Sequence, residues 1–338
     1  MDILLIGGTG IISTAVTELL LRRGDNVYLL NRGKRENPFA GKARQIVADK
    51  TDRAGMKKAL EGLKFDAVAN FIAFNADDVA KDVETFAGMT KQYLLISSAS
   101  AYQKPPTHYI VTESTPLHNP YWGYSRNKIA MEDAAVTAYR EKGFPVTIVR
   151  PSYTYGEFGV PGVFGLSFQH FERIKKGKPL IVHGDGQSLW QMTFNEEFAR
   201  GFAGLIGNAR ALGEAFHITS DEVLTWDQIF QAMGRAIGIE PKLVHIPAEF
   251  LGRAEPSMYD GLKGDMSYSI MLDNSKIKNV VPDFRASTTF YEGMRRCLAW
   301  WAKHPDAHLA TAPNSEKVDR VLALWEKALA LAEPQKSL

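Results

Sequence analysis

The sequence predicts an α/β fold built on a parallel β-sheet, followed by a smaller C-terminal lobe. Two observations lead to this prediction. Short apolar runs alternate with helical stretches through the first half of the 338 residues, which is typical of β–α–β units. After Arg150-Pro151 this alternation gives way to a stretch rich in glycine, proline and aromatic residues, as expected where a second lobe begins.

The strands of the sheet are predicted from short apolar runs of the kind that a parallel sheet buries. We expect strands at residues 3–6, 27–30, 46–48, 67–72, 93–96, 146–149 and, late in the chain, 215–218. Helices are predicted from apolar residues at helical spacing, and Gly24 and Gly143 end two of them. We expect helices at residues 11–23, 124–142, 195–207, 226–237 and 315–333.

The last predicted helix has an apolar stripe, which packs either on its own fold or against a second subunit. The stripe consists of Val318, Leu322, Trp325 and Leu329.

Composition and charge exclude several classes of protein. Hydrophobic residues make up 45% and charged residues 23% of the chain, which excludes disorder as its main state. The 40 lysines and arginines against 38 aspartates and glutamates leave a net charge of +2, so we expect neither nucleic acid nor a membrane surface as a partner. With a single cysteine, Cys297, no apolar run of membrane-spanning length and no signal-like N-terminal run, we expect a cytoplasmic location.

A glycine-rich turn, Gly7-Gly8-Thr9-Gly10, lies between the first predicted strand and its helix. Glycines at this place let the backbone turn tightly and let a pyrophosphate reach the helix N-terminus, where free N–H groups favour an anion. Ser13 takes the place of a third small residue that lets the helix pack closely on the strand. The turn therefore indicates a dinucleotide site, with a plain strand–helix turn as the alternative.

The end of the second strand bears on the choice of dinucleotide. A carboxylate here would bind the ribose 2′-hydroxyl and favour NAD, whereas an arginine can bind the 2′-phosphate of NADP. The chain has Asn31-Arg32-Gly33 at this place, without a carboxylate. NADP is therefore favoured over NAD, and a solvated loop arginine is the alternative for Arg32.

A second group of polar residues indicates acid–base chemistry. Tyr124 and Lys128 are four residues apart near the start of a predicted helix, so their side chains share one face. A phenol with a pKa of about 10 is a poor acid–base group at neutral pH, and a neighbouring ammonium favours its phenolate form. Ser97, Ser98 and Ser100 follow the predicted strand at 93–96, where a hydroxyl could polarise a carbonyl beside the tyrosine.

These elements, in this order, resemble the extended, epimerase/dehydratase-type branch of the short-chain dehydrogenase/reductase superfamily. The resemblance implies a Rossmann-type doubly wound parallel sheet with a smaller C-terminal substrate-binding lobe. It also implies that Ser98, Tyr124 and Lys128 are the catalytic residues. The turn that begins at Asn31 resembles an atypical branch that includes chloroplast stem-loop-binding relatives.

The resemblance implies a cofactor site for NADP or NAD. Its residues are Gly7, Gly8, Thr9, Gly10, Ile11, Ile12, Asn31, Arg32, Asp49, Phe71, Ile72, Ala73, Ser97, Tyr124, Lys128, Pro151 and Tyr153. Candidate substrate contacts are Ser100, Tyr102, Trp122 and Trp190, with a core position as the alternative for Trp122. The expected domains are a cofactor-binding domain at 1–156 with returns around 187–220, a substrate-binding lobe at 157–186 and 221–304, and a helical extension at 305–338.

Two departures from the family pattern narrow the expected activity. Family dehydratases carry an Asp-Glu pair where this chain has Ala99 and Ser100, so dehydration is disfavoured. The arginine that holds a nucleotide diphosphate in many members is absent after Gly184-Asp185-Gly186, which puts nucleotide-sugar binding in doubt. The residues that could replace it, or that simply form a solvated helix end, are Arg173, Lys175, Lys176 and Lys178.

We therefore expect an NAD(P)-dependent oxidoreductase that acts on a secondary alcohol or ketone, with a sugar-like molecule as one class of small-molecule substrate. Tyr124 would transfer the proton, Lys128 would assist it and bind the nicotinamide ribose, and Ser98 would bind the substrate oxygen. One alternative is an epimerase, acting on a sugar or nucleotide sugar, that keeps its cofactor bound. A second alternative is a non-catalytic NAD(P)-binding, RNA-binding or regulatory protein.

The sequence also bears on assembly and on metal binding. The Tyr-Lys helix pairs across a two-fold axis in the family, so we expect a homodimer in which small apolar residues of that helix allow close approach. They are Ile129, Ala130, Ala134, Ala135 and Ala138. No metal is expected, because Pro305 interrupts the helix that would align His304 with His308, and both histidines are expected at the surface.

Overall fold

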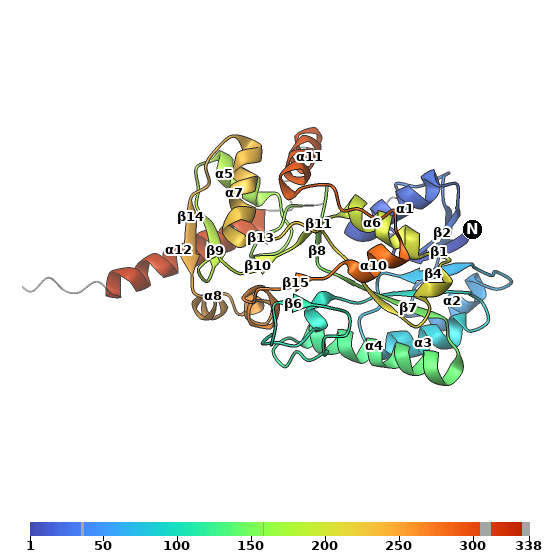
Figure 1. Cartoon of the computed structure of the whole chain (residues 1–338). Coiled ribbons are helices and arrows are strands. Elements are labelled where there is room, and N and C mark those ends of the chain that lie inside the picture. Colours follow the sequence, from blue (N-terminus) through green and yellow to red (C-terminus); the bar gives the residue numbers. More distant parts are fainter. Residues whose placement is uncertain (35–36, 158, 305–311, 333–338) are drawn as a thin grey trace, which may run out of the picture. The chain divides into compact units, whose positions relative to one another are not determined.

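The computed structural model describes residues 1–34, 37–157, 159–304 and 312–332 (Figure 1). The chain divides into two compact units, each made of three stretches. Unit 1 comprises Met1–Thr154, Gln191–Asp221 and Leu272–Ser287. Unit 2 comprises Tyr155–Trp190, Glu222–Met271 and Thr288–Leu338. Pro305, His308 and Glu333, which entered the sequence predictions, lie outside the described residues.

Unit 1 is built on a seven-stranded sheet with the order β12-β7-β5-β4-β1-β2-β3, in which every neighbouring pair is parallel. Its strands are β1 (Asp2–Ile6), β2 (Asn26–Asn31), β3 (Arg44–Val47), β4 (Ala67–Asn70), β5 (Tyr93–Ile96), β7 (Val146–Pro151) and β12 (Ala215–Ile218). The chain runs outward from β1 to β3 and then returns to the other side of β1 at β4. This reversal is the doubly wound topology, so the predicted α/β fold class is confirmed.

The helices of unit 1 cover both faces of the sheet. They are α1 (Ile11–Arg22), α2 (Arg53–Ala59), α3 (Ala76–Phe86), α4 (Gly123–Lys142), α6 (Asn195–Leu205) and α10 (Ser275–Val280). Ile3 and Leu5 of β1 belong to a core with residues of α1 and α6, and Leu4 and Ile6 belong to a core with residues of α3 and α4. Figure 1 shows these two helix pairs on opposite sides of the strands. A strand buried on both faces explains the continuous apolar runs in the sequence.

The end of β4 differs from the prediction, which extended this strand to residue 72. The Asn70 side chain accepts a hydrogen bond from the Ile72 backbone N–H at 2.8 Å and so turns the chain away from the sheet. An asparagine that bonds the backbone two residues on is a common turn former. The segment 71–74 is therefore a loop above the sheet edge.

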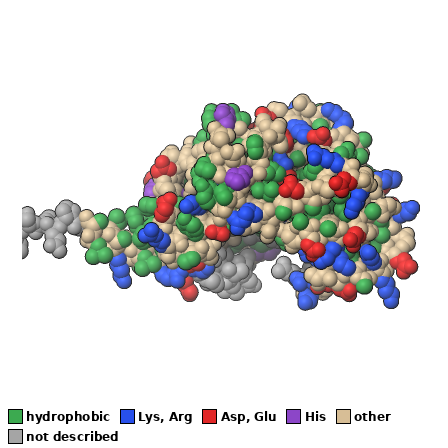
Figure 2. All heavy atoms as spheres, turned by 90° about the horizontal axis from the view of Figure 1, so that it is seen from below, with side chains coloured by type: hydrophobic (Ala, Val, Ile, Leu, Met, Phe, Trp, Pro, Cys, Tyr) green, Lys and Arg blue, Asp and Glu red, His purple; other side chains and the backbone are tan. Residues whose placement is uncertain are grey.

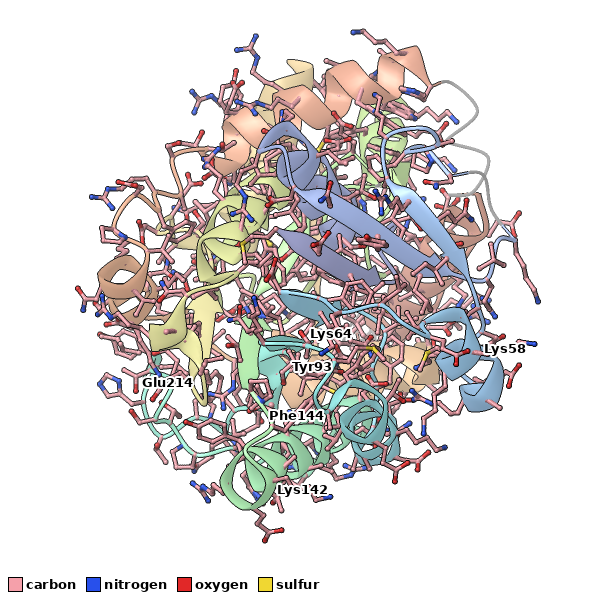
Figure 3. All side chains as sticks on the ribbon, turned by 90° about the vertical axis from the view of Figure 1, so that its right-hand side faces the viewer. Lys58, Lys64, Tyr93, Lys142, Phe144 and Glu214 are labelled. Carbon is pink, nitrogen blue, oxygen red and sulfur yellow. The ribbon has the colours of Figure 1, made fainter. Side chains whose placement is uncertain are left out.

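The C-terminal end of α4 is fixed by a glycine and an aromatic pair. Gly143 has a positive φ of 65°, which an L side chain rarely adopts, and its N–H bonds the Tyr139 carbonyl at 3.1 Å. The Phe144 ring then lies 5.2 Å from the Tyr93 ring of β5 (Figure 3). This contact helps to hold α4, which carries Tyr124 and Lys128, against the sheet.

The dimer prediction rested on small residues of α4. The structure buries two of them, Ala135 and Ala138, in the core of unit 1, where they pack under the sheet of the same chain. Ala130 is exposed, and Ile129 and Ala134 are half-buried. Two of the five residues are therefore not at a surface, and the homodimer stays a prediction.

Unit 2 has short strands and several helices. Its strands are β9 (Leu180–His183), β10 (Leu189–Trp190), β13 (Leu224–Thr225) and β14 (Leu243–Ile246). Its helices are α5 (Gln169–Lys175), α7 (Trp226–Ile237), α8 (Ala248–Ala254), α9 (Tyr259–Gly261), α11 (Phe290–Lys303) and α12 (Ala312–Ala332), and a π-helical turn follows α9 at Leu262–Met266. Strands β6 (Ile110–Val111), β8 (Tyr153–Tyr155), β11 (Met192–Phe194) and β15 (Met271–Leu272) complete the described strands.

Helices α7 and α12 were predicted from the sequence. Thr225 caps α7, because its hydroxyl accepts the Gln228 N–H while the Gln228 side chain accepts the Thr225 N–H. In α12, Val318 and Leu322 of the predicted stripe are buried, whereas Leu329 is 49% exposed. In the described part of the chain no helix combines the length and apolar character needed to cross a membrane.

Candidate active site

The glycine-rich turn between β1 and α1 leaves no room for side chains. A Cβ on Gly7, whose φ is +81°, would lie 2.6 Å from the Ile72 side chain, and a Cβ on Gly8 would lie 2.5 Å from the Leu29 side chain. Ser13 closes the turn, since its hydroxyl donates to the Gly7 carbonyl at 2.6 Å and accepts the Gly10 N–H at 2.8 Å. The serine that replaces the third glycine of the family pattern therefore stabilises the turn.

A cavity of about 420 Å³ lies beside this turn. Seven of the predicted cofactor residues line it, namely Gly7, Thr9, Gly10, Asn31, Arg32, Asp49 and Ile72. Seven further residues that were not among the predicted cofactor contacts also line it, namely Leu30, Gly33, Lys34, Ala48, Lys50, Thr51 and Phe74. The structure thus brings the ends of β1, β2 and β3 and the loop after β4 together around one cavity.

Three cations and one carboxylate set the charge of this cavity. Arg32, Lys34 and Lys50 line it together with Asp49. The Thr51 N–H and hydroxyl donate to the Asp49 carboxylate at 2.9 and 2.8 Å, and these bonds, with the nearby charges of Arg32 and Lys34, hold the pKa of Asp49 below its ordinary value. The excess of positive charge suits a ligand that carries phosphates.

The Asn31 side chain shapes the turn after β2. Its Oδ1 accepts the Gly33 N–H at 3.0 Å and the Gln45 side-chain amide at 3.1 Å. The neighbouring Arg32 side chain is exposed at the cavity. A neutral residue that bonds its own turn therefore occupies the place at which a carboxylate would select NAD.

Two lysines hold consecutive carbonyls of the loop after β4. The Lys50 ammonium donates to the Ile72 carbonyl, and the Lys128 ammonium donates to the Ala73 carbonyl at 3.0 Å. The Phe74 ring is near both, with its centroid 5.4 Å from the Lys50 Nζ and 5.2 Å from the Lys128 Nζ. This loop therefore links the cavity to Lys128 of α4.

Lys128 is buried beside Tyr124. Its ammonium also donates to the Ile96 carbonyl at the end of β5, at 2.8 Å, and its Nζ lies 5.6 Å from the centroid of the Tyr124 ring. Burial lowers the pKa of Lys128 to about 8, the charge of Lys50 acts in the same direction, and Glu132 and Asp78 act against it. An ammonium has three N–H donors, and the two carbonyls accept two of them.

Ser98 follows β5 and bonds its neighbours. Its hydroxyl bonds the Ser100 hydroxyl at 3.0 Å and accepts the Ser100 N–H at 3.2 Å. The Ser125 hydroxyl of α4 donates to the Ser100 hydroxyl at 2.9 Å, and Asn119 donates to the Ser100 carbonyl at 2.8 Å. Ser100 is buried and ties α4 to the end of β5, while Ser98 is half-buried in the same serine chain.

The other predicted contacts lie in different surroundings. Tyr102 is fully buried, and its hydroxyl bonds the Arg150 guanidinium at 2.8 Å and the His217 ring. The Trp122 ring lies 4.9 Å from the Tyr124 ring. Trp190 belongs to unit 2, where its ring lies 5.8 Å from the Trp226 ring.

Several predicted cofactor residues do not line the cavity. They are Gly8, Ile11, Ile12, Phe71, Ala73, Ser97, Tyr124, Lys128, Pro151 and Tyr153. Among them, the Ser97 hydroxyl is buried and has no hydrogen-bond partner in the described residues. An orphaned buried hydroxyl costs free energy unless a ligand or water pairs with it. This hydroxyl and the crowded glycines Gly7 and Gly8 of the turn fit a dinucleotide that runs from the cavity toward α4.

Histidines form no metal site in the described residues, where no group of three or more His, Cys, Asp or Glu side chains could hold an ion. His304 is exposed and its ring stacks on the Trp300 ring with centroids 4.0 Å apart. Its predicted companion, His308, is not described.

Residues 3–219 match the sequence profile of the NAD dependent epimerase/dehydratase family. The chain belongs to this family. It is accordingly an enzyme of the extended short-chain dehydrogenase/reductase superfamily, as the resemblance predicted.

Curated relatives within the epimerase/dehydratase family carry different names. Chloroplast stem-loop binding protein of 41 kDa b from Arabidopsis thaliana is 29% identical over 73% of this chain and 67% of that protein. 2′-Dehydrokanamycin reductase from Streptomyces kanamyceticus is 24% identical over 74% of this chain and 70% of its own. The decarboxylating sterol-4-alpha-carboxylate 3-dehydrogenase from Bos taurus is 30% identical over 72% of this chain and 71% of its own.

Solved structures of similar proteins share the fold. Pal from Bacillus thuringiensis superposes with a TM-score of 0.75 at 18% identity, covering 90% of this chain and 100% of that one. UDP-glucose 4-epimerase from Thermotoga maritima, solved with UDP-glucose, superposes with a TM-score of 0.74 at 20% identity and the same coverage. These likenesses establish the epimerase/dehydratase fold for the chain.

Proposed function

We propose that the protein is an NAD(P)-dependent oxidoreductase that interconverts a secondary alcohol and a ketone, with Ser98, Tyr124 and Lys128 as catalytic residues. The observation that carries the proposal is the Lys128 ammonium, held by two backbone carbonyls beside the Tyr124 ring. The glycine turn and the cationic cavity support a dinucleotide as the cofactor.

The three catalytic residues have different tasks. Tyr124 exchanges a proton at its Oη with the substrate oxygen, and the adjacent Lys128 charge favours the phenolate form. Ser98 presents its hydroxyl to the same oxygen. The third N–H of Lys128 binds the nicotinamide ribose. The nicotinamide, when bound, supplies or accepts the hydride.

A glycoside with an oxidisable ring hydroxyl is the substrate class that we propose. The relative named 2′-dehydrokanamycin reductase supports a keto-glycoside, and it also supports net reduction. Ala99 and Ser100 stand where dehydratases have their acidic pair, and Ser100 is bonded into the serine chain, so the site offers no carboxylate for loss of water. Epimerisation through the same transient oxidation is the second candidate, which relatives named as epimerases support.

A panel of keto-glycosides with NADPH or NADH, followed by the loss of nicotinamide absorbance at 340 nm, tests this function. Reduction of at least one ketone is expected. Native mass spectrometry of the purified protein separates the second candidate, because an epimerase is expected to retain its dinucleotide through purification.

The cofactor is expected to be NADP(H). Arg32→Ala should reduce the preference of the protein for NADP(H) over NAD(H). Arg32 and Lys34 lie exposed at the cavity, where Asn31 replaces the carboxylate. Loss of a charge-assisted phosphate contact should weaken NADPH binding by about 1.5–3 kcal/mol and leave NADH binding nearly unchanged. Calorimetric titration of both dinucleotides measures the change.

Arg22→Ala provides the matched control, because Arg22 is an exposed arginine at the far end of α1. It removes the same charge and should leave the preference intact. A wild-type protein that binds NADH more tightly, or an Arg32→Ala variant with unchanged affinities, would contradict the assignment.

Cofactor affinity is expected to fall as the pH rises through about 8. The pKa of Lys128 is lowered to about 8, so its ammonium is present below that pH and is lost above it. Neutral Lys128 no longer offers a charged donor to the ribose. Fluorescence titration of NADPH across this range should therefore show one step.

Two variants identify the group that titrates. Lys128→Met should weaken binding at neutral pH and abolish the step. Tyr124→Phe should retain the step, because the phenol is not the titrating group. A step that persists in Lys128→Met would assign the pH dependence to another residue.

RNA binding is the candidate function from another class, suggested by the name of one relative, the chloroplast stem-loop binding protein. The net charge of +2 gives little general attraction for nucleic acid. Figure 2 shows Lys and Arg side chains interspersed with Asp and Glu on the face in view. The absence of hydride transfer to every ketone tested, together with specific RNA binding, would favour this candidate.

A further inference from the structure

Unit 2 contains a second cavity, of about 650 Å³. Its walls come from β9 and the turn after it, from β14 and the start of α8, from α9 and the residues that follow it, and from α12. The lining residues are His183, Gly184, Asp185, Ser188, His245, Pro247, Ala248, Glu249, Tyr259, Lys263, Ser267, Tyr268 and Trp325. The volume lies within the range of about 300–1,000 Å³ that small-molecule sites occupy.

The cavity carries carboxylates without cationic partners. Glu249 forms no hydrogen bond or ion pair with the described residues, and Asp185 forms no ion pair with them. Lys263, the only lysine in the lining, donates to the Tyr259 hydroxyl at 3.0 Å, and its ammonium lies 5.4 Å from the centroid of that ring. No arginine lines the cavity. Its charge is thus opposite to that of the cationic cavity in unit 1.

Aromatic rings and hydroxyls complete the lining. Tyr259, Tyr268 and Trp325 contribute rings, which can pack on the apolar face of a sugar ring and attract a cation. Ser188 and Ser267 contribute hydroxyls, which both donate and accept hydrogen bonds. Rings together with such groups are typical of sites that bind polyhydroxylated molecules.

His183 contributes a neutral ring to the wall of this cavity. Its Nε2 lies 2.8 Å from the Met266 carbonyl, which can only accept, so Nε2 carries the proton. Burial lowers the pKa of His183 to about 4, and Nδ1 is therefore an unprotonated acceptor at neutral pH. The residue is 2% exposed, and Nδ1 has no hydrogen-bond partner in the described residues. This nitrogen is itself fully buried, so a ligand in the cavity meets other atoms of the His183 ring.

We infer that this cavity binds a polyhydroxylated small molecule that carries an ammonium group, such as an amino sugar or an aminocyclitol. The ammonium lies against Glu249 and Asp185, and the ring packs on the aromatic side chains. A nucleoside diphosphate does not suit the site, because its negative charges meet two carboxylates and no guanidinium. The site belongs to unit 2 alone, so the inference does not depend on the proposed hydride transfer.

Ligand-observed saturation-transfer NMR on the full-length protein tests the inference with three probes. The first is the disaccharide of two glucosamine units, the second is its neutral di-N-acetylated form, and the third is UDP. The glucosamine disaccharide is expected to bind at slightly acidic pH, and its affinity is expected to fall as the salt concentration is raised. Equal binding of both disaccharides, binding of UDP alone, or no binding of the glucosamine disaccharide would each overturn the inference.

Substitutions locate the binding. Glu249→Gln and Asp185→Asn should each lower the affinity for the glucosamine disaccharide by about two- to fivefold, the scale of an exposed ion pair. Ala248→Phe should block the cavity. Glu240→Gln removes an exposed carboxylate of unit 2 outside the lining and should change nothing. Binding that survives Ala248→Phe in a folded protein would place the ligand elsewhere.

The outcome of the binding assay does not depend on whether the proposed function is correct. Tyr124→Phe should leave binding of the glucosamine disaccharide unchanged, because Tyr124 belongs to unit 1. Binding without any ketone reduction would support the cavity and count against the oxidoreductase. Reduction of a ketone without binding of the cationic sugar would support the oxidoreductase and count against the proposed ligand of the cavity.

Discussion

Replacing Tyr124 with phenylalanine is expected to lower turnover by about 10²–10⁴-fold, the range for loss of a general acid–base. Only one hydroxyl is removed, and the ring remains to pack on Trp122. Lys128 keeps its bonds to the Ala73 and Ile96 carbonyls, so the ribose contact is expected to survive. Turnover should fall while dinucleotide affinity and the free energy of unfolding stay close to those of the wild type.

Steady-state kinetics, dinucleotide titration and chemical unfolding of one preparation separate these effects. Tyr109→Phe is the control, since Tyr109 is 50% exposed and its ring stacks on His108 in unit 1. It should leave all three quantities unchanged. Wild-type turnover in Tyr124→Phe would show that this phenol does not transfer the proton.

Glu132→Ala is expected to destabilise unit 1 by about 3–5 kcal/mol, the cost of breaking a buried ion pair on one side. Three bonds of 2.6–3.1 Å join the Glu132 carboxylate of α4 to the Arg150 guanidinium of β7, with 3% and 7% of the two side chains exposed. Burial opposes the charged form of Arg150, and the bonds from Glu132 keep its pKa above the ordinary value. Without the carboxylate, a buried guanidinium loses its counter-charge.

Denaturant unfolding followed by circular dichroism measures this loss. Glu141→Ala is the control, because Glu141 is an exposed glutamate near the end of the same helix. The double variant Glu132→Met with Arg150→Leu should lose less than the sum of the single losses, since the two side chains are in contact. A Glu132→Ala protein as stable as the control would mean that water or a local shift compensates Arg150.

The ion pair between Glu132 and Arg150 also helps to position Tyr124. Lys128 and Glu132 follow Tyr124 at intervals of four residues on the face of α4 that packs on the sheet. Lys128 binds a carbonyl of the loop after β4 and a carbonyl at the end of β5, and Glu132 binds β7. The helix turn that presents the phenol is therefore anchored at two points.

The sheet of unit 1 could be predicted because its central strands are buried on both faces. Runs such as residues 3–6 and 93–96 contain only apolar residues, which a single-sided sheet would not require. The strands of unit 2 contain two to four residues, and their longest apolar run is the three residues 180–182 of β9. Helix α11 was missed although Thr289 and Glu292 carry the cap pattern, and the structure shows the Thr289 hydroxyl accepting the Glu292 N–H.

Some residues of the cationic cavity in unit 1 could be identified from the sequence and others could not. Asn31 and Arg32 could be named because they stand at the end of a predicted strand, where a parallel sheet binds ligands. Asp49 was named from the family resemblance. Lys50 also follows a strand, so its position was a readable signal. Phe74 was not readable, because its place depends on Asp78, whose carboxylate accepts the Phe74 N–H and the Lys50 ammonium. Such a loop is defined by tertiary contacts and not by local pattern.

The order of the stretches along the chain has a consequence during synthesis on the ribosome. Strand β7 ends at Pro151, and its outer neighbour β12 begins only at Ala215, after an excursion into unit 2. At about 5–20 residues per second, the wait from β7 to the end of β12 lasts roughly 3–13 seconds. During that time β7 presents an unpaired edge, which invites pairing with other chains. Nascent chains that end between these two strands are therefore the ones that most need a chaperone.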